Sequence, residues 1–209
     1  MLDETRIRQL LQPFGLDPTP VQVEQITNYL QLLLRWNAKI NLTAIRDSEE
    51  CVTRHFGESL FISNSLKLTG NLLDIGSGAG FPGLALKIVF PEISVTLLEP
   101  IAKKRAFLKE AARVCGFAHV NVRGERLEAF AGATPALAFD AATMRAVGSL
   151  NTLVPLAASC LRPLGKLLLW LTRDQAAVLP TIDSGLTWLD PVPIPLSTAG
   201  EIWVGVIGR

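Results

Sequence analysis

The sequence predicts an α/β fold in which a mostly parallel sheet follows a small N-terminal helical region and ends in an antiparallel hairpin. Two observations support this prediction. Residues 1–66 have helical periodicity and helix end signals, whereas short apolar runs alternate with helical segments from Asn71 onward. Such alternation is typical of strands joined by crossover helices in a doubly wound sheet. We therefore expect a helical region, residues 1–66, packed on a core domain, residues 67–209.

The residue pattern predicts two helices in residues 1–66 and five strands that alternate with helices in residues 67–209. A turn at residues 16–20 leads into a helix from about 21 to 36, and Asp47 or Ser48 caps the start of another. The expected strands are 72–75, 94–98, 120–123, 139–144 and 166–171, with helices near 82–89, 102–115, 125–130 and 149–160. In the tail, 187–192 and 202–207 are strand-like and form the expected hairpin at the edge of the sheet.

Composition and charge narrow the class of protein. The 209 residues are 49% hydrophobic with a formal net charge of +1, which excludes global disorder and gives no strong basic field. Because there is no apolar signal region and no run of about 18 apolar residues, we expect a cytoplasmic protein without a membrane span. Cys51, Cys115 and Cys160 lie far apart without C-x-x-C spacing, which predicts reduced thiols and no metal.

A glycine-rich turn, DIGSGAGFPG, follows the first expected strand and opens the first helix of the core. Ligands of open parallel sheets bind beyond the carboxyl ends of the strands, so this turn marks a ligand site. Two interpretations fit it. Gly78-x-Gly80-x-x-Gly83 has the spacing of a dinucleotide fingerprint, whereas Gly76-x-Gly78-x-Gly80 after Asp74 suits a loop for S-adenosylmethionine (AdoMet).

The charges near the turn favour AdoMet. Asp74 would repel an anionic pyrophosphate, whereas AdoMet carries an ammonium and a sulfonium group. Glu99 ends the second strand, where a carboxylate can accept hydrogen bonds from ribose hydroxyls of either cofactor. The C-terminal hairpin also favours a methyltransferase sheet over a dinucleotide fold. We therefore expect a Rossmann-like class I AdoMet-dependent methyltransferase.

Two later strand ends are expected to complete the nucleoside site. After the third strand, Glu125 or Glu128 is placed to reach the adenine edge and Leu127 to cover its face, the alternative being a solvated helix start. Arg145 ends the fourth strand, which lies beside the first strand in this topology. We therefore expect the Arg145 side chain at the rim of the active site and outside the core.

Six blocks in order carry a resemblance to one bacterial family. They are RWNAKINLTAIRD (35–47), RHFGESL (54–60), LLDIGSGAGFPGLALKIVFPE (72–92), KKRAFL (103–108), GERLEAF (124–130) and RAVGSLNTLV (145–154). The chain resembles the ribosomal RNA small-subunit methyltransferase G family, also called glucose-inhibited division protein B, over about residues 20–170. The resemblance implies an enzyme that transfers a methyl group from AdoMet to N7 of a guanine in the 530 loop of 16S rRNA.

The resemblance also implies roles for single residues. By motif, Gly76, Phe81, Leu127, Glu128 and Arg145 correspond to cofactor contacts. The implied partner is 16S rRNA or the small ribosomal subunit, and we expect a monomer. Methylation at N7 removes no proton, so no general base is required, and we expect Arg145 to act as a positioning residue.

Basic residues near the expected cofactor site are candidates for RNA contacts. Lys103 and Lys104 open the helix after the second strand, and we expect them to share one patch with Arg54 and Arg173. Arg173 stands where the family usually has a Lys-Gly pair. His55 lies inside a matched block, either as an RNA contact or as a structural hydrogen-bond partner. The aromatic candidates for stacking on a target base, or for the core, are Trp36, Phe56 and Phe81.

Other functions stay open from the residues alone. An AdoMet-dependent methyltransferase with another RNA, a protein or a small molecule as substrate would have the same fold. An NAD-dependent oxidoreductase would use the dinucleotide spacing of the turn, against which Asp74 and the terminal hairpin argue. A binding protein without catalysis is disfavoured because Gly76, Glu99 and Arg145 are all present.

Overall fold

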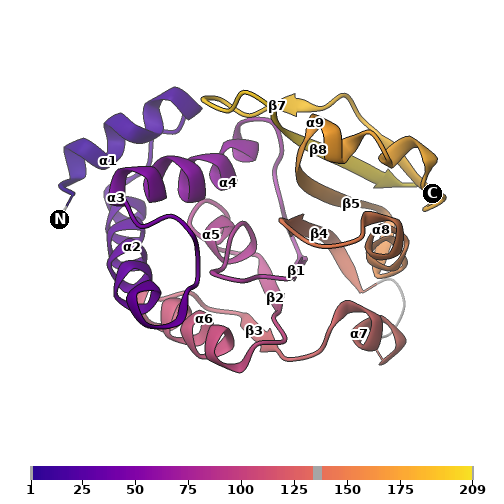
Figure 1. Cartoon of the computed structure of the whole chain (residues 1–209), viewed down its shortest axis with the longest axis horizontal. Coiled ribbons are helices and arrows are strands. Elements are labelled where there is room, and N and C mark those ends of the chain that lie inside the picture. Colours follow the sequence, from indigo (N-terminus) through magenta and orange to yellow (C-terminus); the bar gives the residue numbers. More distant parts are fainter. Residues whose placement is uncertain (1, 134–137, 209) are drawn as a thin grey trace.

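A single sheet runs through the computed structural model, which describes residues 2–133 and 138–208 (Figure 1). Its strands are β1 (Asn71–Ile75), β2 (Ser94–Leu98), β3 (Val120–Arg123), β4 (Phe139–Arg145), β5 (Leu161–Thr172), β6 (Leu186–Trp188), β7 (Val192–Pro193) and β8 (Gly200–Ile207). The strand order is β3-β2-β1-β4-β5-β8-β6, with β7 paired to β8. The first five strands are parallel and the later ones antiparallel, which confirms the expected α/β class.

The tail differs from the expected hairpin in where its strands lie. β8 pairs with β5 on one side and with the short strands β6 and β7 on the other, so it lies inside the sheet and β6 and β7 form this edge. Its residues Ile202 and Val204 are buried, and apolar side chains of this kind favour an inner position. The stretch expected as the first strand of the hairpin is divided into β6 and β7.

Helices precede the sheet and connect its strands. They are α1 (Glu4–Leu11), α2 (Pro20–Ile40), α3 (Ser48–Glu50), α4 (Glu58–Leu60), α5 (Gly83–Leu86), α6 (Ala102–Val114), α7 (Leu127–Ala133), α8 (Leu150–Ser159) and α9 (Arg173–Ala176), with 3₁₀ turns η1 (Gln12–Phe14), η3 (Phe61–Asn64) and η4 (Leu179–Thr181). Thr19 and Gln22 form a capping box at the start of α2. α2 extends four residues beyond the expected end, because no helix-breaking residue occurs before Asn41, which ends it with φ of 51°.

The segment η2 (Cys51–Gly57) is a π-helix that continues from α3 into α4. Asp47 caps this run by accepting a hydrogen bond from the Glu50 amide at 2.8 Å, as expected. Nothing in the residue pattern predicts the wider turn. π-helical turns occur frequently at functional sites, and this one carries Arg54 and His55.

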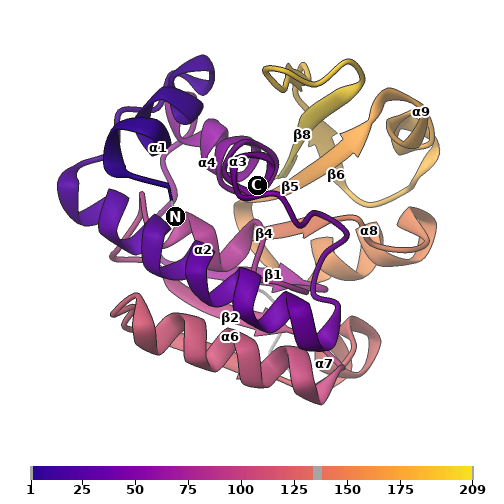
Figure 2. The same cartoon turned by 60° about the vertical axis from the view of Figure 1, so that its left-hand side comes forward.

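Two hydrophobic clusters cover the two faces of the sheet. Along β1, Leu72 faces the cluster that includes α1, α2, α5 and α6, whereas Leu73 and Ile75 face the cluster that includes α7 and α8. The N-terminal helices therefore share one core with the sheet, and α2 lies side by side with α6 on that face (Figure 2). The three cysteines are buried and free of disulfides. In the parts of the chain that the structure describes, no helix is both long and apolar enough to cross a membrane.

Candidate functional site

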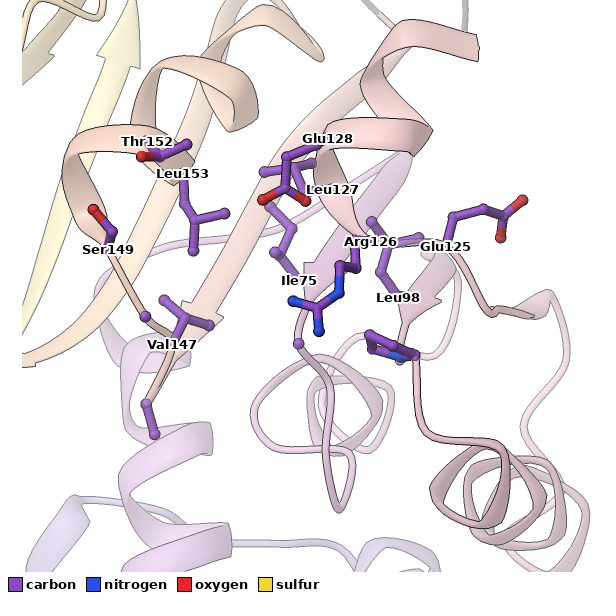
Figure 3. A pocket seen from close by; sticks show the side chains of 14 residues that line it. Ile75, Leu98, Glu125, Arg126, Leu127, Glu128, Val147, Ser149, Thr152 and Leu153 are labelled. Atoms are coloured by element: carbon purple, nitrogen blue, oxygen red, sulfur yellow. The ribbon is translucent and has the colours of Figure 1, made fainter.

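A cavity of about 380 Å³ opens at the carboxyl ends of β1, β2 and β4, and we call it the first cavity (Figure 3). Its volume lies in the range of small-molecule sites, about 300–1,000 Å³. It combines apolar side chains with exposed backbone and a few charged groups. The lining residues are Ile75, Gly76, Leu98, Pro100, Glu125, Arg126, Leu127, Glu128, Ala146, Val147, Gly148, Ser149, Thr152 and Leu153.

The glycines of the turn serve different purposes. Gly76 and Gly78 have φ of +71° and +55°, and a Cβ on Gly78 would meet no atom closer than 3.8 Å. Gly78 thus leaves open space next to the turn, whereas a Cβ on Gly76 would lie 3.1 Å from Val147, which lines the first cavity. A Cβ on Gly80 would lie 2.0 Å from the Tyr29 hydroxyl, and one on Gly83 would lie 2.3 Å from Asp74. The last two glycines of the dinucleotide spacing are therefore required by packing inside the protein.

The turn rests on aromatic side chains from the N-terminal helices. The Tyr29 hydroxyl donates a hydrogen bond to the Ala79 carbonyl at 2.7 Å. Phe81 stacks with the Tyr29 ring at 5.2 Å and with the His55 ring at 4.8 Å, both at 17° between planes. Phe81 is buried among these rings and does not line the first cavity. Its contact with a cofactor stays a prediction.

Asp74 and Glu99 lie beneath the turn and do not line the first cavity. Asp74 accepts a hydrogen bond from the Thr143 hydroxyl at 2.7 Å, while its Oδ2 has no hydrogen-bond partner in the described residues. Burial raises the pKa of Asp74 to about 6. Glu99 accepts hydrogen bonds from the Gly78 and Ile101 amides, both at 2.9 Å, and so holds the turn in place. Contacts of Asp74 and Glu99 with a cofactor stay predictions.

The start of α7 contributes the carboxylates of the first cavity. Leu127 and Glu128 line it, in the place that the sequence indicates (Figure 3). Glu125 is ion-paired with Arg123 at 2.5 Å, and this hydrogen bond lowers the pKa of Glu125 to about 2. Within residues 2–133 and 138–208, Glu128 makes no hydrogen bond or ion pair. Glu128 is therefore available to a cationic or hydroxyl-bearing ligand.

A second cavity, of about 470 Å³, lies on the other side of Ala146, a residue that lines both cavities and has φ of 51°. Two basic side chains line it, Arg54 and Arg145, whereas one, Arg126, lines the first cavity. The lining residues are Arg54, Glu58, Arg145, Ala146, Trp170, Leu171, Thr172, Gln175, Ile194, Leu196, Ser197, Thr198, Ala199 and Gly200.

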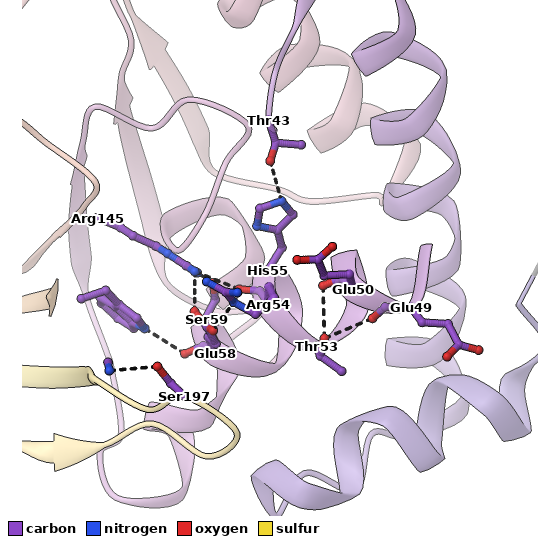
Figure 4. Close-up of polar contacts among 12 residues, drawn as sticks. Thr43, Glu49, Glu50, Thr53, Arg54, His55, Glu58, Ser59, Arg145 and Ser197 are labelled. Carbon is purple, nitrogen blue, oxygen red and sulfur yellow. Dashed lines mark hydrogen bonds and ion pairs between the residues drawn. The ribbon is translucent and has the colours of Figure 1, made fainter. Parts of the chain in front are cut away.

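A buried carboxylate holds two guanidinium groups in the second cavity (Figure 4). Glu58, whose side chain is 8% exposed, pairs with Arg54 at 2.7 Å and with Arg145 at 2.5 Å. Arg145 also donates hydrogen bonds to the Arg54 carbonyl at 2.9 Å and to Ser59 at 3.3 Å. Trp170 donates to the Glu58 carbonyl at 2.8 Å.

Arg145 lies at the wall of a cavity and outside the hydrophobic clusters, but it is less exposed than a rim position leads one to expect. Its side chain is only 18% exposed, because the carboxylate of Glu58 draws it against α4. Arg145 lines the second cavity and not the first, so its contact with a cofactor stays a prediction. The sequence analysis missed Glu58, although it lies in the matched block RHFGESL, where a carboxylate four residues after Arg54 is the available signal.

Known proteins resemble this chain in sequence and in fold. A family model described as rRNA small subunit methyltransferase G matches residues 22–178.

The chain belongs to the rRNA small subunit methyltransferase G family.

Relatives in this methyltransferase G family agree with the match. The chain is 43% identical over 146 residues to the ribosomal RNA small subunit methyltransferase G of Alkaliphilus metalliredigens, with 68% of this chain and 61% of the relative covered. It is 43% identical to the same protein of Halorhodospira halophila, with 70% and 68% covered. The match thus spans about three fifths of the length of the Alkaliphilus relative.

Solved structures resemble the fold. A ribosomal protein L11 methylase from Lactobacillus delbrueckii aligns with a TM-score of 0.61 at 14% identity, covering 75% of this chain and 79% of the other. A tRNA (m1A58) methyltransferase from Aquifex aeolicus aligns with a TM-score of 0.56 at 15% identity, covering 72% and 68%. At such identities, the similarity concerns the methyltransferase fold alone.

Hydrogen bonds give the residues of the block W-N-x-x-x-N-L-T a structural role in this methyltransferase G chain. Buried Asn37 accepts a hydrogen bond from the Thr43 amide at 3.0 Å and donates one to the Ile45 carbonyl at 3.1 Å, which folds residues 41–47 back on α2. The Thr43 hydroxyl is 2.9 Å from Nε2 of His55. Burial and the neighbouring arginines lower the pKa of His55 to about 4, which keeps it neutral at pH 7.

The candidates for RNA contacts lie on different elements. Arg54 lines the second cavity, whereas Lys103 and Lys104 lie in the first turn of α6. Arg173 is ion-paired with Glu201 at 2.8 Å and does not line the second cavity. Among the aromatic candidates, Phe56 is fully buried and Trp36 is half-buried. In the described residues, no group of His, Cys, Asp and Glu is arranged to hold a metal ion.

Proposed function

We propose that this protein transfers a methyl group from AdoMet to N7 of a guanine in the 530 loop of 16S rRNA. The observation that carries the proposal is the pair of cavities that meet at Ala146 in a member of the methyltransferase G family. The first cavity has apolar walls, the guanidinium of Arg126 and the carboxylate of Glu128, which has no partner among the described residues. The second cavity has two guanidinium groups, both held by Glu58. A cationic methyl donor and an electron-rich base therefore suit opposite sides of one residue.

The groups of the first cavity fit AdoMet. Gly76 offers backbone without a side chain, Leu127 offers an apolar surface, and Glu128 is a carboxylate without a partner among the described residues. Opposite charges attract across such a site, whereas the pyrophosphate of a dinucleotide would be repelled by Glu128. When bound, AdoMet supplies a methyl group activated by a sulfonium centre.

The second cavity suits the target base. The N7 lone pair of guanine forms the new bond to the methyl carbon while the carbon–sulfur bond breaks and its electron pair stays on sulfur. The positive charge moves to the purine and no proton leaves, so no residue has to act as a base. Arg145 remains protonated and can donate to O6, the acceptor next to N7. Its place in the second cavity favours a role in positioning the base over a contact with the cofactor.

Chemical cleavage at N7-methylguanine in 16S rRNA tests the proposed function. Naked 16S rRNA and small subunits lacking this methyl group are incubated with AdoMet and the wild-type protein, Arg145→Ala or Arg145→Lys. We expect cleavage in the 530 loop with wild type, a loss of about 100-fold or more in single-turnover rate for alanine, and poor rescue by lysine, which lacks the planar fork. Arg8→Ala, on α1, is the control and should retain the wild-type rate.

Separate calorimetric titrations with AdoMet and with NAD test the cofactor. AdoMet should bind to wild type and to Arg145→Ala with similar affinity, and NAD should not bind. Binding of AdoMet without methylation of either RNA form would assign the enzyme to another substrate. We also propose that the protein acts as a monomer in the cytoplasm, where a ribosomal substrate is found.

A further inference from the structure

The antiparallel packing of α2 against α6 brings the end of α2 next to the start of α6 (Figure 2). Gln25 donates a hydrogen bond to the Cys115 carbonyl at 3.1 Å, and the Trp36 ring contacts the Phe107 ring at 5.8 Å. Because position 25 lies opposite 115 and position 36 lies opposite 107, the last turn of α2 lies opposite the first turn of α6. Residues near 39 and near 103 are therefore neighbours across the helix pair.

A cavity of about 470 Å³ lies along this helix pair, and we call it the helix groove. Its floor is apolar, with Leu32, the half-buried Trp36 and Ile40, and its sides are charged. The lining residues are Leu32, Arg35, Trp36, Lys39, Ile40 and Glu110. An aromatic ring with cations beside it is the arrangement that binds an unpaired base and its phosphates.

Positive charge dominates the helix groove. Arg35 and Lys39 are exposed and make no hydrogen bond or ion pair within the described residues. Glu110 is engaged by Arg113 through two hydrogen bonds of 2.9 and 2.7 Å, which lower its pKa. Exposed Lys103 lies seven residues before Glu110, two helical turns away on the same face of α6. Arg35, Lys39 and Lys103 therefore lie on adjacent helices without a hydrogen bond or ion pair among the described residues, although the formal net charge of the protein is only +1. The charge of Arg35 contributes to the lowered pKa of Glu110.

The helix groove leads toward both cavities of the site. The first turn of α6 follows Pro100, which lines the first cavity. At the end of α2, residues 41–47 connect to the segment that carries Arg54, a residue of the second cavity. A strand of RNA that lies in the helix groove can therefore continue to the second cavity without crossing the sheet.

We propose that the helix groove binds single-stranded RNA that flanks the target guanine, a proposal that rests on the proposed function. Arg35, Lys39 and Lys103 contact consecutive phosphates, and one unstacked base packs on the Trp36 ring. Stacked bases of a duplex would present only phosphates to this surface and would leave the apolar floor uncovered. The occupant is therefore an unpaired strand, which the charge and the aromatic floor together select.

The test is binding of a 16S rRNA fragment containing the 530 loop, measured at several salt concentrations. Each lost phosphate contact lowers the salt slope by about 0.7 for a single strand. Arg35→Ala/Lys39→Ala should therefore reduce the slope by about 1.4 and the affinity by roughly 25-fold at 0.1 M salt, and should approach wild type near 1 M salt. AdoMet affinity should not change. Lys67→Ala removes an exposed lysine that precedes the amino end of β1, away from the carboxyl ends of the strands, and should bind like wild type.

Variants of Trp36 test the stacking contact. Trp36→Phe should retain most of the affinity, and Trp36→Ala should lose roughly tenfold without a change in the salt slope. Because Trp36 also packs on Phe107, melting curves accompany these variants. If Trp36→Ala does not fold, the salt slope of Arg35→Ala/Lys39→Ala still decides whether RNA binds in the helix groove.

The outcomes separate the helix groove from the proposed function. If wild type methylates the RNA and the Arg35→Ala/Lys39→Ala slope is unchanged, the helix groove is not the docking surface. If the double variant binds a duplex as weakly as it binds the fragment while Trp36→Ala binds normally, the surface recognises phosphates of a duplex. If naked RNA binding is unchanged and only subunit binding falls, the partner is a ribosomal protein. Absence of methylation by wild type would count against the proposed function.

Discussion

The two cavities on either side of Ala146 are held in shape by different forces. Under the first cavity, Tyr29 and Phe81 support the glycine turn by stacking and by one neutral hydrogen bond. Beside the second, Glu58 fixes Arg54 and Arg145 by ion pairs. The first arrangement leaves the Glu128 carboxylate without a partner among the described residues, whereas the second arrangement positions its cations before any substrate arrives.

The comparison shows that the N-terminal helices belong to both halves of the site. α2 provides Tyr29, and η2 with α4 provides Arg54 and Glu58. Neutral packing suits a wall next to a cationic ligand, because it adds no competing charge. Paired charges suit a wall that must orient a base, because a guanidinium held by a carboxylate loses little freedom when the base binds. The variants below alter one support at a time.

The largest loss of stability is expected from Gly80→Ala, which disturbs the packing of the glycine turn on Tyr29. Gly80 has φ of +86°, and the new Cβ would lie 2.0 Å from the Tyr29 hydroxyl. We therefore expect the unfolding free energy to fall by more than about 4 kcal/mol and AdoMet binding to be lost. Urea unfolding and calorimetry measure both. Adding Tyr29→Phe to Gly80→Ala should restore part of the stability, because the clashing oxygen is removed.

Gly78→Ala is the matched control in the same turn. Its Cβ has open space, so only the left-handed backbone costs about 1 kcal/mol and the fold should persist. AdoMet affinity should nevertheless fall, because the methyl group enters space next to the ligand. Equal destabilisation by the two alanines would contradict the division of the turn into ligand-facing and packing glycines.

Glu58→Ala removes the ion pairs with Arg54 and Arg145 beside the second cavity. It leaves the guanidinium of Arg145 partly buried without a carboxylate, and loss of one member of such a pair costs about 3–5 kcal/mol. Glu58→Gln retains an acceptor and should cost less. Glu49→Ala, which removes the exposed ion pair with Arg6, should have no measurable effect. Denaturant unfolding gives all three values, and a Glu58→Ala variant as stable as wild type would show that the pair contributes nothing.

The pH dependence of stability distinguishes Asp74 from His55, because burial shifts their two pKa values in opposite directions. Burial raises the pKa of Asp74 from 3.8 to about 6, so folded Asp74 keeps a proton that the unfolded chain releases. Its contribution to stability is present below about pH 4 and is lost as pH rises through 6. The pKa of His55 falls from 6.5 to about 4, so its contribution is lost as pH falls from 6.5 to 4. Each contribution to the free energy of unfolding is about 3 kcal/mol, because a pKa shift of one unit corresponds to about 1.4 kcal/mol.

Asp74→Asn and His55→Gln therefore change the pH profile in opposite directions. Between pH 6.5 and 4, Asp74→Asn should lose stability more steeply than wild type, and His55→Gln should gain stability relative to wild type. Unfolding free energies at half-unit pH steps measure both differences. Parallel profiles for wild type and both variants would show that neither group titrates as its burial requires.

Tyr29→Phe should have the smallest effect. It removes the hydrogen bond to the Ala79 carbonyl but keeps the stacked ring, so we expect a loss of about 1 kcal/mol in stability and a few-fold weaker AdoMet binding. Thr27→Val on the same helix, whose hydroxyl bonds only the Val23 carbonyl, should leave AdoMet affinity unchanged. Equal affinities for wild type and Tyr29→Phe would mean that the stack alone supports the turn.

Much of the fold could be predicted because its signals are local. β2 and β3 have the predicted bounds, and α6 ends one residue early, since period-2 and period-3.6 patterns and end signals lie within each segment. The tail could be predicted only in part. That β8 lies between β5 and β6 depends on long-range pairing, which the pattern of one strand does not specify. The π-helix η2 likewise has no local signal.

The sequence by itself determined the parallel α/β class, the neighbouring positions of β1 and β4, the turn at the end of β1, the family, and the place of Leu127 and Glu128 in the first cavity. These follow from chain order and motif spacing. Only the tertiary structure decided that Gly80 makes room for Tyr29, that Glu99 holds the turn, and that Arg145 turns to Glu58. The physical reason is that burial and pairing of a side chain depend on distant elements, since Arg145 and Glu58 are 87 residues apart, and no local pattern encodes such contacts.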